Sequence, residues 1–314
     1  MSKFILNTPV VLCVFRRLDT TKKVFERIRE ARPPRLYIIS DAAREQVEGE
    51  REKVAEVRRY IEQNVDWKCE VFKNYAAVNM GCGRRIPDGI NWVFESEETA
   101  IILEDDCLPE SSFFQYCQEM LEYYKNDDRI MVIGGNNPFA SCYKSEEDYL
   151  FSKVPFMWGW ATWKRTWEQY DFDLKTFPKD KSNPIFKKIF PLKAYWVYMS
   201  EFESLYRHEF DAWDYQVMYA SIMYDKLNIV PSESHVFNIG FHEEATHTFK
   251  IPRWMEQKVT PVHFPIRHRD KVVWDKEFDM GYFRKANQHG HIVKLKSMLG
   301  LNINRPIFES IRKQ

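Results

Sequence analysis

Ala100-Ile101-Ile102-Leu103-Glu104-Asp105-Asp106-Cys107-Leu108-Pro109 joins a short apolar run to three consecutive carboxylates. Continuous apolar runs are typical of strands that are buried on both faces. Three adjacent acids at the end of such a strand repel one another unless a cation or several hydrogen-bond donors lie among them. The pattern therefore predicts a divalent metal site for a phosphate-bearing ligand. A helix cap or a solvated turn is the alternative.

Strand and helix patterns alternate on both sides of this stretch. The predicted strands cover 9–15, 36–39, 69–72, 100–104 and 130–133, and the predicted helices cover 19–32, 45–63, 90–97 and 113–124. This alternation predicts an α/β fold with a mostly parallel central sheet flanked by helices. Ligands of such sheets bind outside the carboxyl ends of the strands. Because Arg17, Asp41 and the acidic triplet all follow strands, we expect them to share one rim.

The composition is that of a packed globular protein of 314 residues, with 44% hydrophobic and 16% aromatic residues. Lys+Arg and Asp+Glu both number 46, so no overall charge favours nucleic acid as a partner. Six scattered cysteines without a CxxC pair argue against cysteine-bound zinc and indicate a reducing, cytoplasmic setting. We expect no signal peptide, and no apolar run approaches the roughly 20 residues that span a bilayer.

Several short motifs occur in one order over roughly residues 8 to 250. They are Val14-Phe15-Arg16-Arg17-Leu18-Asp19, Ile39-Ser40-Asp41, Asn79-Met80-Gly81-Cys82-Gly83, Ile102-Leu103-Glu104-Asp105-Asp106, Phe113-Phe114, Gly159-Trp160-Ala161-Thr162-Trp163, Ala212-Trp213-Asp214 and Ala245-Thr246-His247-Thr248. As an ordered set they resemble GT-A fold glycosyltransferases, in particular the bacterial glycosyltransferase family 2 or hemolytic-protein-like group. The chain is also similar to the Golgi N-acetylglucosaminyltransferase that adds the first GlcNAc to the N-glycan core.

The resemblance implies a metal-dependent, inverting transferase that uses a nucleotide-diphosphate sugar, most simply a UDP-sugar, and a hydroxyl acceptor on a glycan, lipid-linked glycan or protein. In that family's pattern Asp106 is the ligand of Mn²⁺ or Mg²⁺, while Glu104 and Asp105 hold ribose or metal-bound water. Asp41 faces uracil, with capping of the next helix as the alternative. Arg17 reaches the nucleotide or diphosphate, with a surface ion pair as the alternative.

Two further motifs are expected beside the donor. Asn79, Gly81 and Arg84, together with Gly83 and Arg85, form a donor-side loop by this resemblance, although an ordinary turn fits the glycines equally well. Trp160 and its motif shape the donor and acceptor pockets because aromatic faces suit sugar rings. Core packing is the alternative for these tryptophans.

Asp214 is the candidate general base, because an inverting transferase needs a carboxylate to accept the proton of the attacking hydroxyl. Asp214 could instead only cap a helix, and then Asp211 or Glu209, which lie nearby, would be the base. The resemblance makes His247 a further metal or diphosphate ligand, with His242 as its substitute.

The bacterial relatives usually read Asn-Arg-Pro-Asp where this chain reads Arg16-Arg17-Leu18-Asp19, so the first loop departs from the family. Two rival functions stay open. A sugar-nucleotide pyrophosphorylase would carry a glycine-rich loop after the first strand, and this loop has no glycine. A non-catalytic carbohydrate-binding or toxin-like protein would not need Asp106, Asp214 and His247.

We expect residues 1–270 to form the catalytic domain, with a nucleotide-binding half at about 8–110 and an acceptor-side half at about 111–270. Residues 271–314 are predicted as a C-terminal helical extension. The apolar residues of the tail, interspersed with lysines from about His289 onward, fit a packed terminal helix. The alternative is an amphipathic helix that lies on the inner face of a membrane or binds a partner.

Overall fold

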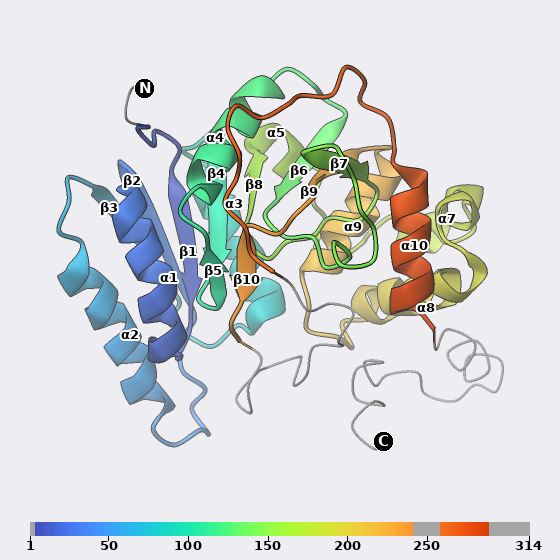
Figure 1. Cartoon of the computed structure of the whole chain (residues 1–314). Coiled ribbons are helices and arrows are strands. Elements are labelled where there is room, and N and C mark those ends of the chain that lie inside the picture. The colour runs from blue at the N-terminus through green and yellow to red at the C-terminus, as the bar shows by residue number, and fades with distance from the viewer. Residues whose placement is uncertain (1–3, 241–257, 289–314) are drawn as a thin grey trace.

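The computed structural model describes residues 4–240 and 258–288, which are built around one eight-stranded sheet (Figure 1). The strands are β1 (Val10–Val14), β2 (Arg35–Ser40), β3 (Glu70–Tyr75), β4 (Thr99–Glu104), β5 (Cys107–Pro109), β6 (Ile130–Gly134), β7 (Tyr149–Ser152), β8 (Trp160–Trp163), β9 (Leu227–Pro231) and β10 (Val236–Asn238). The order across the large sheet is β3-β2-β1-β4-β8-β6-β9-β7, and β10 pairs with β5 separately.

The first four strands of the large sheet, β3, β2, β1 and β4, are all parallel. Strand β8 runs antiparallel to both β4 and β6, β9 is parallel to β6, and β7 is antiparallel to β9. The predicted α/β class with a mostly parallel central sheet is therefore confirmed. The strands predicted before residue 134 correspond to β1 to β4 and β6.

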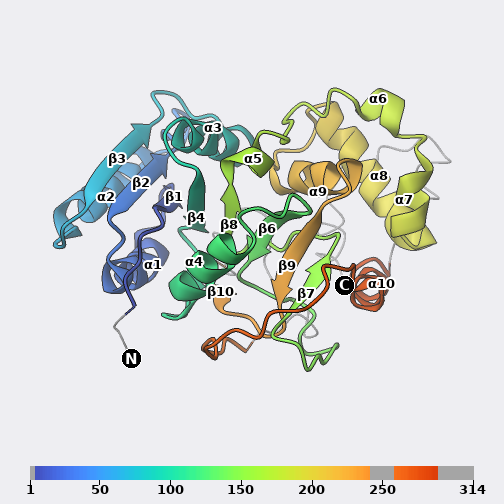
Figure 2. The same cartoon turned by 90° about the horizontal axis from the view of Figure 1, so that it is seen from above.

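Helices cover both faces of the sheet. They are α1 (Leu18–Ala31), α2 (Glu50–Asn64), α3 (Cys82–Phe94), α4 (Phe113–Tyr123), α5 (Lys164–Trp167), α6 (Phe177–Asp180), α7 (Pro184–Ile189), α8 (Leu192–Tyr206), α9 (Asp214–Met223) and α10 (Lys276–Ala286). Figure 2 shows α1 and α4 on one side of the sheet and α3 and α9 on the other. Helices α6 to α8 gather at the end of the sheet that is remote from β3.

The two faces follow from the alternation of side chains along β1. Val10, Leu12 and Val14 belong to the apolar cluster that contains the buried residues of α1, α2 and α4. Val11 and Cys13 belong to the cluster of α3 and α9 on the opposite face. Successive side chains of a strand point to opposite faces, so a continuous apolar run is what a strand covered on both sides requires.

Two predicted helices begin at other residues than expected. The helix predicted from Glu45 begins at Glu50, after Gly49 turns the chain at φ 74°. The helix predicted at 90–97 begins at Cys82, because Gly81 at φ 76° turns the chain and Asp211 accepts a hydrogen bond from the amide of Gly83. A local pattern cannot reveal a cap that comes from so distant a residue.

Helix α10 packs against the second half of the chain, where Phe278 and Phe283 are fully buried in a third apolar cluster. The buried Asp279 fastens it: the carboxylate accepts hydrogen bonds from Ser152 Oγ at 2.5 Å, from the amide of Lys153 at 2.8 Å and from Trp274 Nε1 at 2.6 Å. The domain division at residue 270 stays a prediction. The predicted tail helix beyond His289 lies outside the described residues, and no described helix is long and apolar enough to cross a membrane.

Replacing Asp279 by alanine should lower the free energy of unfolding by about 2 to 3 kcal/mol, because the Lys153 amide and the Ser152 hydroxyl would stay buried without an acceptor. Urea unfolding followed by circular dichroism measures this. Glu277→Ala on the exposed side of the same helix is the control and should change stability by less than about 0.5 kcal/mol. Equal effects of the two variants would contradict the anchoring role of Asp279.

Candidate functional site

The acidic triplet lies where several parallel strands end. Glu104 is the last residue of β4 and is in register with Cys13 of β1, while Val14 of β1 is in register with Ser40 of β2. The predicted common rim is therefore confirmed for the segments that carry Arg17, Asp41 and the triplet. In open α/β sheets this rim is the usual place for ligands.

Arg17 forms ion pairs with two acids of the triplet. Its guanidinium donates one hydrogen bond to Asp105 Oδ1 and another, at 2.9 Å, to Asp106 Oδ2. The amide of Phe15 also donates to Asp105, at 3.4 Å. Burial alone lowers the pKa of Arg17, but the two carboxylates raise it above its ordinary value, so the guanidinium stays charged. Arg17 is thus held in the rim by an internal ion pair, not by a surface one.

One guanidinium does not balance the carboxylates around it. Burial, together with the negative charges of Asp106, Asp105 and Asp214, raises the pKa of Glu104, and Arg17 only partly offsets the rise. Burial also raises the pKa of Asp105, in spite of its contact with Arg17. Within the part of the chain that the structure describes, no hydrogen bond to the Glu104 carboxylate is found. A site with this excess of negative charge favours an additional cation.

Asp41 holds the loop after β3. Its carboxylate accepts hydrogen bonds from the amides of Ala42, Met80 and Gly81 at 2.8 to 3.1 Å, and from Asn79 Nδ2 at 3.1 Å. Burial raises the pKa of Asp41, and these amides partly lower it again. No helix begins at Asp41, so the capping alternative is wrong. Its expected contact with uracil stays a prediction.

Asp211 holds the next residues of the same loop. Its carboxylate accepts a hydrogen bond from the amide of Gly83 at 2.8 Å. A Cβ atom on Gly81 or Gly83 would lie 2.8 or 2.4 Å from a carboxylate oxygen of Asp211. The glycines are therefore needed for this close approach. Since Asp211 is bound to the start of α3, it is a weaker candidate for the base than Asp214.

Arg84 and Arg85 differ in environment. Arg84 is exposed, and its guanidinium lies 4.8 Å from the ring centroid of Phe172. Arg85 is buried and donates to the carbonyl of Ser40 at 3.3 Å and to Asn74 at 2.6 and 2.7 Å. Arg85 therefore joins the ends of β2 and β3, a structural role. A donor contact of Arg84 stays a prediction.

The unusual Arg16 has a structural partner that the sequence did not reveal. Its Nη1 lies 2.9 Å from Oε1 of Glu50, the buried first residue of α2. Glu50 also accepts three hydrogen bonds from Arg44. Arg16, which replaces the residue expected in the motif, thus connects the loop after β1 to the start of α2.

Trp160 braces the position of Asp214. Trp160 lies in β8 opposite Ile102, two residues before Glu104, and only 1% of it is exposed. Its ring centroid is 5.7 Å from that of Trp213, which directly precedes the exposed Asp214 at the start of α9. This burial favours the core-packing alternative for Trp160. The contact between these two rings nevertheless places Asp214 where its charge acts on Glu104.

Glu201 of α8 is a further carboxylate near Asp214 that no motif indicated. Burial and the charge of Asp214 raise the pKa of Glu201 to about 7. Glu209, the other alternative base, is exposed, and its amide donates to the carbonyl of Ser204. The sequence could not single out Glu201, because only the packing of α8 beside α9 brings the two carboxylates together.

The chain passes directly over Asp106 before it leaves the described residues. The amide of Ile239 donates to the carbonyl of Asp106 at 2.8 Å. A Cβ atom on Gly240 would lie 2.2 Å from Asp106 Oδ2 and 2.9 Å from Arg17 Nη1, so a larger residue there would displace these two side chains. His242 and His247 follow in residues 241–257, outside the described part, and the role of His247 stays a prediction.

The carboxylates of the rim suit a hard divalent cation whose other positions are filled by a phosphate-bearing ligand. Among the described residues, no three His, Cys, Asp or Glu side chains form a metal cage by themselves. Mg²⁺ typically takes only one or two carboxylates and completes its shell with phosphates and water, and Mn²⁺ also accepts oxygen ligands. Asp106, with its side chain 14% exposed, and Glu104 are the carboxylates that could take this part.

No family model and no curated protein matches the chain. Solved structures with a similar course include a mannosyltransferase from Pyrobaculum calidifontis in complex with GDP-Man and Mn²⁺ (TM-score 0.35, 12% identity, 53% of this chain and 47% of that one). TarS from S. aureus aligns with TM-score 0.39 and 8% identity over 74% of this chain and 60% of that one. UDP-glucose pyrophosphorylase in complex with UDP-glucose aligns with TM-score 0.36 and 12% identity over 72% of this chain and 90% of that one. The alignments thus span less than two thirds of the first two proteins, and such values assign no activity to this chain.

Replacing Arg17 by glutamine should lower the free energy of unfolding by about 3 kcal/mol, because Asp105 and Asp106 lose their buried cation. The loss should be smaller at about pH 5 than at about pH 8, because an unpaired carboxylate has a raised pKa in the folded state and protonation relieves it. Urea unfolding at both pH values measures this. Arg27→Gln, which removes an exposed ion pair of α1, the helix that follows Arg17, should have little effect at either pH. A loss that does not depend on pH would contradict the charge argument.

Proposed function

We propose that this protein is a metal-dependent, inverting glycosyltransferase of the GT-A type that transfers a sugar from a nucleotide-diphosphate donor, most simply a UDP-sugar, to a hydroxyl acceptor. One observation carries the proposal: Glu104, Asp105 and Asp106 meet at the carboxyl end of β4, with Arg17 paired to two of them and Asp214 within electrostatic reach. Neither a helix cap nor a solvated turn needs such an arrangement.

The donor side of the site is the acidic rim. A divalent cation held by Asp106, when bound, would neutralise the charge that develops on the departing diphosphate. Arg17 is poised to hold a diphosphate oxygen, because its guanidinium already lies in the rim and has further N–H groups beyond its two hydrogen bonds to Asp105 and Asp106. The loop that Asp41 and Asp211 hold, residues 79–83, supplies backbone close to the donor.

The acceptor side centres on Asp214. The acceptor oxygen attacks the anomeric carbon as the bond from that carbon to the diphosphate oxygen breaks, and the hydroxyl proton passes to the Asp214 carboxylate. The exposed position of Asp214 leaves its carboxylate open to an acceptor hydroxyl. The products are the inverted glycoside and the nucleoside diphosphate.

Calorimetric titration with UDP tests the donor side. Binding should be at least about tenfold tighter with Mn²⁺ than with EDTA, because the metal joins the carboxylates to the diphosphate. Asp106→Asn should remove this metal dependence, while Asp128→Asn, which changes an exposed carboxylate far from the rim, should keep it. Absence of UDP binding to the unaltered protein under both conditions would refute the proposal.

Asp214→Asn should keep metal-dependent UDP binding but lower the rate of sugar transfer by about 100-fold or more, because general base catalysis is lost. A panel of nucleotide sugars with Mn²⁺ would first identify a donor by the release of nucleoside diphosphate. Asp211→Asn and Glu209→Gln serve as comparisons, and Asp214 is not the base if either of them causes the larger loss. Nuclear magnetic resonance of the product's anomeric proton reports whether the configuration is inverted.

A further inference from the structure

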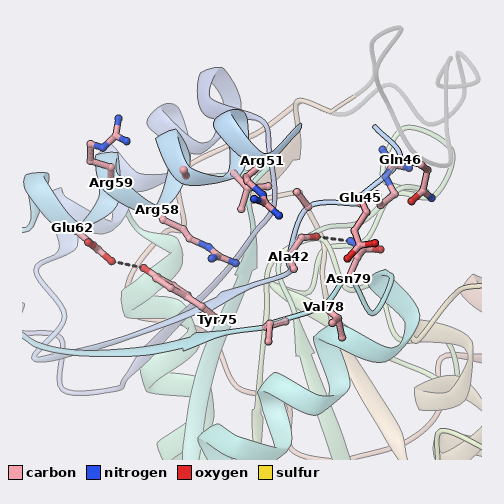
Figure 3. Close-up of a pocket in the computed structure, with 16 residues that line it drawn as sticks. Ala42, Glu45, Gln46, Arg51, Arg58, Arg59, Glu62, Tyr75, Val78 and Asn79 are labelled. Carbon is pink, nitrogen blue, oxygen red and sulfur yellow. Dashed lines mark hydrogen bonds between the residues drawn. The ribbon is translucent and has the colours of Figure 1, made fainter. Parts of the chain in front are cut away.

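A second concave site lies beside the rim, between α2 and the loops that follow β2 and β3 (Figure 3). Its volume is about 870 Å³, which is ample for a small molecule. Alanines from three segments line it, Ala42 and Ala43 after β2, Ala55 on α2, and Ala76 and Ala77 after β3. Because these side chains are short, the wall stays open where α2 passes over the loops.

The α2 side of this pocket is strongly basic. Arg51, Arg58 and Arg59 come from one face of the helix, and Figure 3 shows Arg51 and Arg58 directed toward the cavity. Within residues 4–240 and 258–288, none of these three forms an ion pair with a carboxylate. The lining Glu62 is already occupied by Tyr75 Oη at 2.8 Å and by Lys73 at 3.1 Å.

Arg58 is held rigidly in place. It donates through Nε to Ser40 Oγ at 2.9 Å and through Nη2 to the carbonyl of Asp41 at 2.8 Å. Its guanidinium carbon lies 4.4 Å from the ring centroid of Tyr75. These contacts leave further N–H groups of the guanidinium available, and burial lowers the pKa of Arg58. A fixed, partly buried guanidinium without a counterion is suited to a phosphate group, which it can meet with two parallel hydrogen bonds.

The opposite side of the pocket is polar, and the arginine there, Arg44, is already paired with the buried Glu50. Glu45, Gln46 and Asn79 lie there in Figure 3. Carboxylate and amide side chains bind hydroxyl groups well, whereas Glu45 would repel a second anionic group. The pocket thus combines cations at one side with hydroxyl-binding groups at the other.

We propose that this basic pocket, lined by Arg51, Arg58, Glu45, Gln46 and Asn79, binds a phosphate monoester of a polyhydroxy compound. The phosphate pairs with Arg51 and Arg58, and the hydroxyl groups face Glu45, Gln46 and Asn79. The site is separate from Asp106 and Asp214, and it does not rest on the proposed transferase activity. It shares a wall with the rim, because Asn79 also donates to Asp41 and to the carbonyl of Ala42.

Calorimetric titration with glucose 6-phosphate in metal-free buffer tests the proposal. The unaltered protein should bind glucose 6-phosphate more tightly than either inorganic phosphate or glucose. Arg51→Gln should weaken binding about tenfold, because one charge-assisted contact is lost. Arg51 is exposed, so this variant should keep its fold. Arg58→Gln should weaken binding further, with a melting curve to verify that the variant is folded.

Two variants serve as controls. Arg129→Gln removes an exposed arginine at the start of β6 and should leave the affinity unchanged. Asp106→Asn should also leave it unchanged, because it alters only the acidic rim. Failure of glucose 6-phosphate to bind, equal binding by Arg51→Gln, or loss of binding in Asp106→Asn would overturn the proposal. Equal affinity for inorganic phosphate and glucose 6-phosphate would refute the part that assigns hydroxyl groups to Glu45 and Asn79.

The same chemistry occurs on a free sugar phosphate and on an inositol lipid head group. Cosedimentation with phosphatidylcholine vesicles, with and without phosphatidylinositol 4-phosphate, distinguishes these sources. Retention on the phosphoinositide vesicles that Arg51→Gln abolishes would identify a head group. Binding of glucose 6-phosphate in the titration, without retention on the vesicles, would identify a soluble ligand. Both results support the proposed pocket.

Discussion

The carboxylates that meet at the end of β4 impose the constraint on which the rest of the rim depends. A buried strand brings Glu104, Asp105 and Asp106 to one point, and Arg17 compensates only part of their charge. Uncompensated carboxylates in a half-buried position are costly unless they serve a cation or a ligand. The strand order lowers this cost, because it places Arg17 on the neighbouring loop, directly beside the acids.

Two braces hold the surrounding segments against this centre. Asp41 accepts hydrogen bonds from the amides of Met80 and Gly81, and Asp211 accepts one from the amide of Gly83. Two carboxylates that are distant in the sequence thus fix the start of α3. The tilted, buried rings of Trp160 and Trp213 connect the sheet to the start of α9, where Asp214 lies. The hydrogen bonds of the first brace are partly buried.

Periodicity and turn signals predicted the first half of the fold well, because each strand there is a buried apolar run and each helix has one apolar face. The same reasoning predicted the common rim of Arg17, Asp41 and the acidic triplet. It misplaced the start of α3, because the cap comes from Asp211, and it could not find the partner of Arg16, because Glu50 becomes its neighbour only after folding. Trp160 was expected beside a ligand, but its burial follows from the antiparallel insertion of β8 between β4 and β6, which no local pattern specified.

The acidic rim and the basic pocket carry opposite charges, and both adjoin the loop 79–83 that Asp41 holds. Asn79 contacts both, through Asp41 on one side and the pocket lining on the other. A ligand in either place would therefore act on the same short loop.

A crystal of the protein grown with UDP and Mn²⁺, measured at a wavelength where manganese scatters anomalously, tests the metal role of Asp106. One anomalous peak should lie in contact with the Asp106 carboxylate and with the diphosphate oxygens, beside Arg17. A diphosphate bound without manganese at Asp106, or manganese bound only elsewhere on the chain, would contradict it.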